Sequence, residues 1–432
     1  MSETQIQSIL AWEAFSDYGT PALQVIVKTN SGSVGTTLCA AGTSNSSHET
    51  GFLYDSGDKW KGRGMSLAVR NINHILAPAL TGLDCVKQGV CDEVIHSFSL
   101  ETIGKNAAYA VSSAILKAGA AEKSIPLYAH IGGQRAFTLP VPSMLAASGS
   151  IRYGGSPKAC FKPTYAFTAY DFATFSEASY ALWEVDMNWK DMLRKKLGIK
   201  MTTDAGMCIP PGKLENDYVL WEMLTEVIAD SGYEGKVGLQ ADLSATDFYN
   251  SERRSYRGLF CPKEKSREDV MELAEMMTWD YPFVILEDPL QENDFEGFAE
   301  ITRKTDIQIV GDDLYAMNPG YLEKGLTMKA GNTVLLKPNQ AGTITDMLRL
   351  TDEIRSHGVA VMPCGSRGEG VDICDYAVGL NCGTVREPGI AFHGNRYLQI
   401  EEELKRGKFF GSKGLQGTRF QISCRGGTDE NL

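Results

Sequence analysis

The sequence contains no run of about 18 consecutive apolar residues, the length that a membrane-spanning helix needs. Its first residues, MSETQIQSIL, lack the basic-then-apolar pattern of a secretory signal. Basic residues are in the minority, because 42 Lys and Arg stand against 54 Asp and Glu and give a formal net charge of -12. This balance argues against nucleic acid or an anionic membrane as the main partner. We therefore predict a cytoplasmic protein, for which a small anionic substrate is still possible.

Cysteine and histidine occur without any metal-binding pattern. The ten cysteines are scattered singly and form no C-x-x-C pair, which in a chain of this length indicates reduced thiols rather than a disulfide or zinc framework. The six histidines are dispersed, and none has ligand spacing to another. Any metal site must therefore be built from other side chains.

Short apolar runs that end on a charged or polar residue recur through the second half of the chain. The later ones follow one another at intervals of roughly 20 to 30 residues, which is room for one strand, one helix and two loops. A parallel barrel is the simplest architecture that brings such strand ends to one face, where carboxylates and a lysine could converge. A single charged strand end is common for solvation alone, but six in series favour a site. They are Asp242, Glu287, Asp312, Lys337, Ser366 and Arg386.

The first part of the chain has a different pattern. Two strand-like stretches, QVIVKTN and SVGTTLCA, flank a turn at Ser31-Gly32, and helical periodicity follows. We predict an N-terminal α+β domain over residues 1–136 and a barrel domain over residues 137–432. The Gly- and Ser-rich stretch 40–60 and the segment 150–158 have the composition either of lids or of plain solvated connections, and both interpretations stay open.

Longer motifs give the chain a resemblance to a known family. They are, in order, AWEAFSDYGTP, GLDCVKQGVCDEV, GKNAAYAVSSAILKAGA, IPLYAHIGG, LEDPLQENDFEGF, VGDDLYAMNP, LLKPNQAGTITDML and YLQIEEEL. The set resembles enolase, the glycolytic phosphopyruvate hydratase, over nearly the full length. The resemblance implies an N-terminal α+β capping domain on a modified (β/α)8 TIM-type barrel whose second helix-strand pair departs from the regular pattern. It also implies Mg²⁺, a phosphorylated three-carbon acid as ligand, and a homodimer or higher homo-oligomer.

The resemblance also implies roles for particular residues. Family carboxylates at three successive strand ends bind Mg²⁺, and here they correspond to Asp242, Glu287 and Asp312. Ser44 matches a serine that helps to bind a second metal ion. Lys337 matches the lysine that removes a proton from the carbon next to the substrate carboxylate, which requires a pKa lowered by the metal and nearby cations. The alternative for Lys337 is a structural salt bridge to one of the three carboxylates.

Several family positions are altered, mostly among the groups that assist the loss of hydroxide. The family's Glu-Gly-Gly turn reads TTDAGM here and leaves the shorter Asp204, while Thr164 replaces a second glutamate. The family's Ser-His-Arg-Ser-Gly-Glu loop reads CGSRGE, so that Gly365 replaces the histidine. In the same loop Ser366 and Arg367 exchange the Arg-Ser order of the phosphate-binding pair. An anion could still bind there, but in a different way.

Two further changes concern the substrate's anionic groups. Arg386 replaces the lysine that grips the substrate carboxylate, and it offers a bidentate fork in place of a point charge. The segment 150–158 has no histidine where the family carries one for phosphate. Arg152 or Lys158 could stand in for it, or neither.

The enolate-forming groups therefore persist, while the hydroxide-expelling groups are lost or shortened. We predict a Mg²⁺-dependent lyase or transferase that binds a phosphoenolpyruvate- or 2-phosphoglycerate-like acid, phosphorylated or phosphonylated. Its chemistry would be shifted from hydration, for example to carboxyphosphonoenolpyruvate formation in phosphonate biosynthesis. The alternatives are a phosphopyruvate hydratase with substituted ligands and a non-catalytic binding protein. The complete carboxylate set argues against the last, because clustered buried carboxylates without a metal would repel one another.

Overall fold

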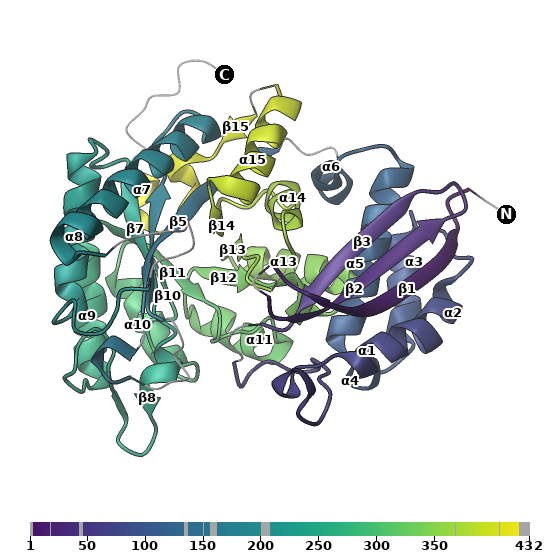
Figure 1. Cartoon of the computed structure of the whole chain (residues 1–432), viewed down its shortest axis with the longest axis horizontal. Helices are drawn as coiled ribbons and strands as arrows, with labels where there is room; N and C mark the ends of the chain where they lie inside the picture. The colour runs from purple at the N-terminus through teal and green to yellow at the C-terminus, as the bar shows by residue number, and fades with distance from the viewer. Residues whose placement is uncertain are drawn as a thin grey trace.

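The computed structural model consists of an N-terminal α+β unit that lies beside a larger barrel (Figure 1). Because some positions are not described, the structural account concerns the following ranges. These are residues 3–17, 19–42, 46–133, 137–149, 151–155, 162–199, 208–367, 369–405 and 407–422.

The N-terminal unit is a three-stranded antiparallel sheet packed against helices. The helix α5 (Lys105–Glu122) lies against β2 and β3, and it comes so close that a Cβ on Gly35 would collide with the backbone of Ala114. The turn between β2 and β3 lies at Ser31-Gly32 as predicted, with Gly32 at a φ of 95° that glycine adopts readily. The strands are β1 (Ile6–Phe15), β2 (Pro21–Thr29) and β3 (Val34–Ala40). The other helices are η1 (Lys59–Gly62), α1 (Ser66–Asn71), η2 (Ile72–Leu76), α2 (Ala77–Leu80), α3 (Gln88–His96), α4 (Leu100–Ile103) and α6 (Leu127–Gly132).

The barrel is one sheet to which eight strands contribute within the described ranges. Their order is β13-β12-β11-β10-β7-β6-β5-β14, and a bridge between Cys364 and Arg386 brings the two edge strands together, so that the barrel nearly closes. The strands are β5 (Val141–Ser148), β6 (Thr164–Ala169), β7 (Val237–Asp242), β10 (Phe283–Glu287), β11 (Gln308–Gly311), β12 (Thr333–Leu336), β13 (Ala360–Pro363) and β14 (Thr384–Pro388). The predicted TIM-type barrel with an N-terminal domain is confirmed.

The second barrel strand, β6, runs against its neighbours. It pairs antiparallel with both β5 and β7. The connection from β5 to β6 covers residues 149–163, and its described part holds only the short η3 (Ile151–Tyr153), whereas a parallel return usually runs through a longer helix. The first residue of β6, Thr164, therefore pairs with Asp242 at the end of β7. This is the departure from the regular barrel that the family resemblance implied.

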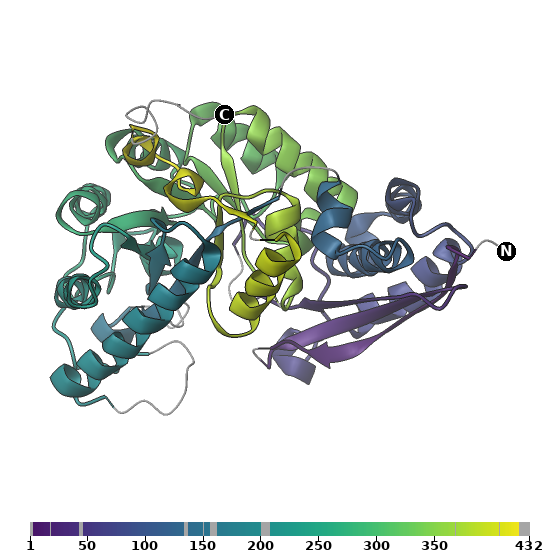
Figure 2. The same ribbon diagram turned by 90° about the horizontal axis from the view of Figure 1, so that it is seen from above.

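The central barrel strands are buried on both faces. β7, β10 and β12 read VGLQAD, FVILE and TVLL, and every residue in them is buried, as is typical of parallel strands covered by helices. The surrounding helices form an outer ring (Figure 2). They are α7 (Phe175–Leu197), α8 (Asp217–Asp230), α9 (Arg267–Asp280), α10 (Phe295–Lys304), α11 (Pro319–Met328), α12 (Pro338–Ala341), α13 (Ile344–Ser356), α14 (Asp372–Gly379), α15 (Ala391–Glu403) and α16 (Thr418–Ile422). The remaining elements are β4 (Thr138–Leu139), η5 (Ala245–Phe248), β8 (Tyr249–Asn250), β9 (Ser255–Tyr256), β15 (Lys408–Phe409) and η6 (Gly411–Gly414).

Buried polar contacts join the N-terminal unit to the barrel. Asp92 accepts a hydrogen bond from the Ser112 hydroxyl at 2.6 Å and another from the backbone N–H of Thr345 at 3.0 Å. The hydroxyls of Ser113 and Tyr376 lie 3.0 Å apart. Such fully partnered groups avoid the cost of unsatisfied burial and fix the N-terminal unit against the barrel.

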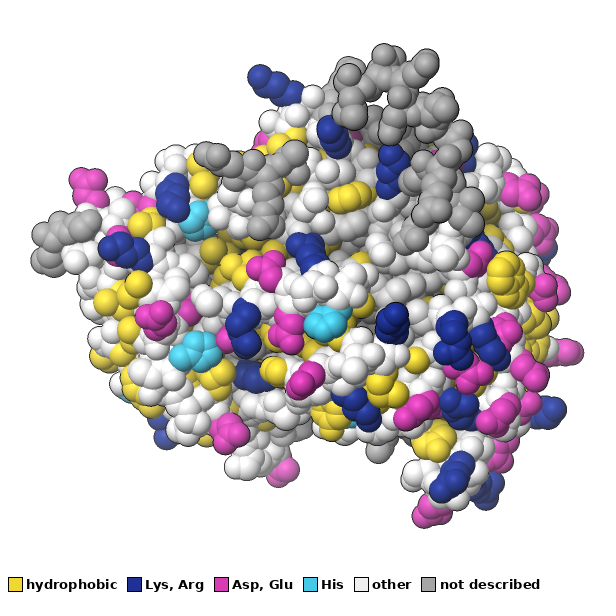
Figure 3. All heavy atoms as spheres, turned by 180° about the vertical axis from the view of Figure 1, so that it is seen from behind, with side chains coloured by type: hydrophobic (Ala, Val, Ile, Leu, Met, Phe, Trp, Pro, Cys, Tyr) yellow, Lys and Arg dark blue, Asp and Glu magenta, His cyan; other side chains and the backbone are white. Residues whose placement is uncertain are grey.

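The outer surface carries charges of both signs. On the face drawn in Figure 3, Lys and Arg side chains are interspersed with Asp and Glu. Among the helices in the described ranges, none combines the length and the apolar character needed to cross a membrane.

Candidate active site

Four of the predicted site residues lie at the carboxyl ends of neighbouring parallel strands. Asp242 ends β7 and pairs in register with Glu287, which ends β10. Asp312 directly follows β11, and Lys337 directly follows β12. All four side chains are buried. The barrel thus brings together at one face the three carboxylates and the lysine that the strand-end pattern singled out.

Two cations converge on Asp242. Its Oδ2 accepts hydrogen bonds from Lys162 Nζ and from Arg386 Nη2, and its Oδ1 accepts one from the Ser244 hydroxyl at 3.1 Å. Arg386 Nε also lies 3.0 Å from Glu287 Oε2. Burial alone would raise the pKa of Asp242, but Arg386 and Lys162 together hold it well below its ordinary value. Asp242 is therefore ionised at neutral pH.

The pKa of Glu287 is shifted in the opposite direction from that of Asp242. It is fully buried, and neither of its carboxylate oxygens has a hydrogen-bond partner within the described part of the chain. Burial raises its pKa to about 8; Arg386 opposes this rise, and the neighbouring Asp242 and Asp312 add to it. Arg386 Nε is the ion-pair partner of Oε2. Buried acceptors that accept no hydrogen bond call for an explanation, and a bound cation is one. Hard carboxylate oxygens are also the ligands that Mg²⁺ prefers, so the donor set fits this ion.

Lys337 donates to Asp312 Oδ2 at 2.6 Å. Burial lowers the pKa of Lys337, but Asp312, Asp313 and Cys364 raise it, and the resulting pKa lies above the ordinary lysine value. The predicted lowering by the metal and nearby cations together stays a prediction. Of the nearby cations, Arg367 lowers the pKa of Lys337, but less than Asp312 raises it. The salt bridge that stood as the alternative for Lys337 is thus present, and it joins the lysine to one of the predicted metal ligands.

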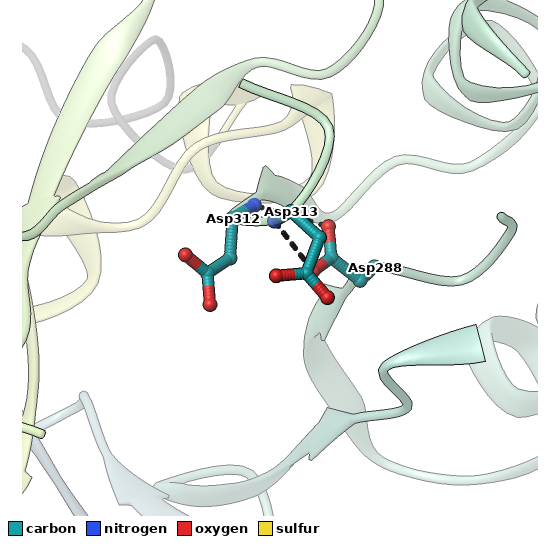
Figure 4. Close-up of side chains that lie close together, drawn as sticks. All are labelled: Asp288, Asp312 and Asp313. Carbon is teal, nitrogen blue, oxygen red and sulfur yellow. Dashed lines mark hydrogen bonds between the residues drawn. The ribbon is translucent and has the colours of Figure 1, made fainter. Parts of the chain in front are cut away.

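A second carboxylate cluster shares Asp312. One carboxylate oxygen each of Asp288, Asp312 and Asp313 lies within 4.8 Å of the other two, and all three residues are buried (Figure 4). Asp288 accepts from the backbone N–H groups of Asp312 and Asp313 at 3.0 and 2.9 Å, and so orders the turn after β11. Burial raises the pKa of Asp313 to about 7, with Asp312 adding to the effect. Asp288 and Asp313 were missed, although each directly follows a predicted ligand in the sequence.

The other predicted residues either lie near Asp242 and Arg386 or fall outside the described ranges. Thr164 is buried beside Asp242, and its hydroxyl accepts from Arg386 at 3.4 Å. Gly365 and Ser366 follow Cys364, whose sulfur lies 3.8 Å from Arg386 Nη1. Residues at three further predicted positions lie outside the described ranges, and these are Ser44, Lys158 and Asp204.

Two arginines expected to bind an anion have internal partners instead. Arg152 is buried and donates to Asp217 at 2.7 Å and to the Ser148 carbonyl at 3.0 Å. Arg367 is 1% exposed and makes a two-pronged pair with Glu49, at 2.7 and 2.6 Å. Both guanidinium groups are therefore already paired with carboxylates inside the protein, and a role of Arg367, or of Arg152 as one of the open candidates, in binding the substrate phosphate stays a prediction.

Lys162 was not singled out from the sequence. It lies two residues before Thr164, at the start of a strand that enters the site in the reverse direction. The only signal was its position in FKPTYAF, the stretch in which the expected glutamate is missing.

The fold and this geometry define a capped TIM-type barrel with buried carboxylates and a lysine at its mouth. Residues 6–131 match the family described as the enolase N-terminal domain, and residues 136–417 match the enolase C-terminal TIM barrel domain. The chain is 34% identical to an enolase of Methanopyrus kandleri over 95% of its own length and 98% of the relative. It is 33% identical to enolases of Methanocaldococcus jannaschii, over 94% and 97%, and of Bifidobacterium animalis, over 92% and 95%. The chain belongs to the enolase family, as the resemblance implied.

Proposed function

We propose that this protein is a Mg²⁺-dependent enzyme that removes the proton next to the carboxylate of a phosphoenolpyruvate- or 2-phosphoglycerate-like acid and stabilises the enolate. Its later chemistry would be shifted from the loss of hydroxide. The observation that carries the proposal is the contrast between two sets of groups around Asp242. The lysine proposed as the base and the three carboxylates proposed as metal ligands lie at neighbouring strand ends, while the strand that faces them presents Thr164 and no carboxylate. The domains would extend over residues 1–136 and 137–432.

Lys337 is the proposed base. In its neutral form its Nζ accepts the proton from the carbon, and the ammonium so formed is stabilised by Asp312 at 2.6 Å. The same contact raises the pKa of Lys337, so the ammonium must lose its proton before each turnover. A divalent ion held by Asp242, Glu287 and Asp312 would offset that carboxylate charge and stabilise the negative charge on the substrate. Arg386, within reach of Asp242 and Glu287, is placed to bind the substrate carboxylate.

The proposed shift in chemistry rests on the groups that would protonate a leaving hydroxide. Thr164 and Gly365 have no acidic proton to give, and the loss of a general acid costs on the order of 10² to 10⁴ in rate. Arg367 is held by Glu49, which changes the way a phosphate could be bound. One reaction of the proposed kind is carboxyphosphonoenolpyruvate formation in phosphonate biosynthesis, in which an enolpyruvate skeleton is kept.

The names of the relatives favour a second candidate. Proteins about a third identical over nearly the whole chain are enolases, so phosphopyruvate hydratase activity with substituted ligands is the alternative. In that case another group, such as Asp204, would have to assist the departing hydroxide.

One assay separates the two candidates. Purified protein is incubated with 2-phosphoglycerate and Mg²⁺ in deuterated water, and phosphoenolpyruvate absorbance is followed together with deuterium exchange at carbon 2. We expect exchange without appreciable elimination, because proton abstraction and hydroxide loss use different groups. Elimination at the rates of ordinary enzymes, about 1 to 10³ per second, would instead establish a hydratase and refute the shifted chemistry.

The metal requirement predicts a stability change. Mg²⁺ at a hundredfold excess over its Kd should stabilise the wild type by about 2.7 kcal/mol, seen as a higher Tm. Glu287→Gln should lose most of this increment and still fold, because a glutamate with a pKa near 8 is largely protonated at neutral pH and its amide is a close mimic.

The matched control is Glu401→Gln, which changes a buried glutamate remote from the site. Glu401 accepts from the backbone N–H of Phe175 at 2.8 Å, at the start of α7. This variant should have a lower Tm but keep the full Mg²⁺ increment. A wild type whose Tm does not respond to Mg²⁺ at any concentration would contradict the metal site.

A further inference from the structure

Lys162 is a buried cation that the proposed reaction does not yet use. It directly precedes Pro163 and β6 and is 9% exposed. Its ammonium pairs with Asp242, and within the described residues no other carboxylate is in salt-bridge contact with it. A lysine so deep in the chain loses its hydration, and it is stable there only while an anion compensates its charge.

Lys162 and Arg386 donate to the same oxygen atom, Asp242 Oδ2. Their nitrogen atoms are therefore neighbours, held together by the single carboxylate between them. They reach it from different strands, because Lys162 precedes β6 and Arg386 lies in β14. Arg386 has a second acidic side chain within reach, Glu287 at 3.0 Å, whereas Lys162 depends on Asp242.

This arrangement sets up a competition. A divalent ion that used Asp242 as a ligand would have to share a carboxylate whose Oδ2 already serves two cations and whose Oδ1 serves Ser244. The like charges of the ion, Lys162 and Arg386 oppose such binding. If Asp242 turned to the ion, the buried Lys162 and the half-buried Arg386 would be left adjacent and short of negative charge. A ligand anion placed between them would restore the balance.

We propose that Lys162 and Arg386 form a paired anion site that takes over the carboxylate of a small acid when Asp242 ligates a divalent ion. The inference rests on the proposed function for the metal and adds Lys162 as a residue that determines specificity. The site then requires metal and acid together: the acid lowers the repulsion that the metal meets, and the metal frees the cations for the acid. By linkage, each ligand raises the affinity for the other by the same factor. Lys162 opposes the metal alone and favours the acid.

The test measures Mg²⁺ binding by calorimetry without any acid, and then phosphoenolpyruvate binding at saturating Mg²⁺. Lys162→Met removes the charge and keeps much of the side-chain length. We expect it to bind Mg²⁺ alone about tenfold more tightly than the wild type, and to bind phosphoenolpyruvate at least about tenfold more weakly. Lys162→Arg keeps the charge and should resemble the wild type in its affinity for Mg²⁺ alone.

Lys265→Met is the matched control. Lys265 is also buried, but its ammonium contacts the Cys261 sulfur at 2.7 Å and the Lys263 carbonyl at 3.3 Å rather than a site carboxylate. This variant loses the same unit of charge and should leave both affinities within about threefold of the wild type. A comparable gain in Mg²⁺ affinity here would mean that net charge, and not Lys162, governs the metal.

A second measurement needs no variant. In the wild type, saturating phosphoenolpyruvate should raise the affinity for Mg²⁺ at least about tenfold. Absence of this coupling, or an unchanged or weaker Mg²⁺ affinity in Lys162→Met, would overturn the paired anion site while leaving the proposed enolate chemistry intact. If neither protein binds Mg²⁺, the metal site fails and the present inference fails with it.

Discussion

Replacing Lys337 with methionine is expected to lower the exchange of the carbon-2 proton of 2-phosphoglycerate by at least about 10² to 10⁴, the usual contribution of a positioned proton-transfer group. Methionine keeps a side chain of similar length but has no basic nitrogen. The buried Asp312 would lose its 2.6 Å partner, so the variant must also be checked for folding by its circular dichroism. Exchange is measured in deuterated water by mass spectrometry of the recovered acid.

The control for this variant is Lys105→Met. Lys105 lies close by, with its ammonium 3.3 Å from the carbonyl of Gln340, three residues beyond Lys337, but it has no carboxylate partner among the described residues. Burial lowers the pKa of Lys105, so this lysine is a demanding control for the assignment of the base. Its variant should keep exchange within about threefold. If Lys105→Met lost exchange and Lys337→Met kept it, the base would have been misassigned.

The barrel could be predicted because the pattern that indicates each strand and helix lies within a short stretch of sequence. Each central strand is an apolar run that ends on a charged residue, and the spacing between runs leaves room for one helix. The reversal of β6 could not be deduced from residues alone. TYAFTA reads like any buried strand, and its direction follows from the connection before it, which has no helical periodicity to mark a crossover. Only the family resemblance carried that expectation.

The site was predictable where a residue's role follows from its strand position. Asp242, Glu287, Asp312 and Lys337 converge because parallel strands end at the same edge of the sheet. The arginines were harder, because an exposed ligand-binding arginine and an internally paired one look alike in sequence. Whether an arginine is internally paired depends on an acidic residue far away in the sequence. Lys162 was overlooked for the same reason, because its partner Asp242 lies 80 residues further along the chain.

The buried pair of Arg152 and Asp217 shows how such partners act. Asp217 is fully buried, and its carboxylate accepts from Arg152 at 2.7 Å, from the Tyr153 hydroxyl at 3.0 Å and from the Tyr165 hydroxyl at 2.7 Å. Burial lowers the pKa of Arg152, but Asp217, together with Tyr165 and Tyr153, raises it, and the resulting pKa lies above its ordinary value. Arg152 is therefore charged inside the protein, and its stability there depends on one carboxylate.

Asp217→Asn should consequently destabilise the protein by about 3 to 5 kcal/mol, since it leaves a buried guanidinium without its counter-charge. The amide keeps the shape of the side chain, so loss of packing contributes little. Urea unfolding measures the change, and Trp221 is a local reporter because it is buried with its ring 6.4 Å from that of Tyr165. Circular dichroism recorded on the same samples shows whether the two domains unfold together.

The double variant Asp217→Asn with Arg152→Met isolates the cause. When both charges of a buried pair are removed, the desolvation cost of each disappears as well, and the replacement is often close to neutral. The double variant should therefore be more stable than Asp217→Asn alone, although it lacks one more native side chain. A double variant less stable than the single one would mean that the guanidinium stabilises the fold by packing and by its bond to the Ser148 carbonyl rather than through the ion pair. Because Tyr165 follows Thr164 on β6, loosening of this network should also disturb the register that places Thr164 beside Asp242.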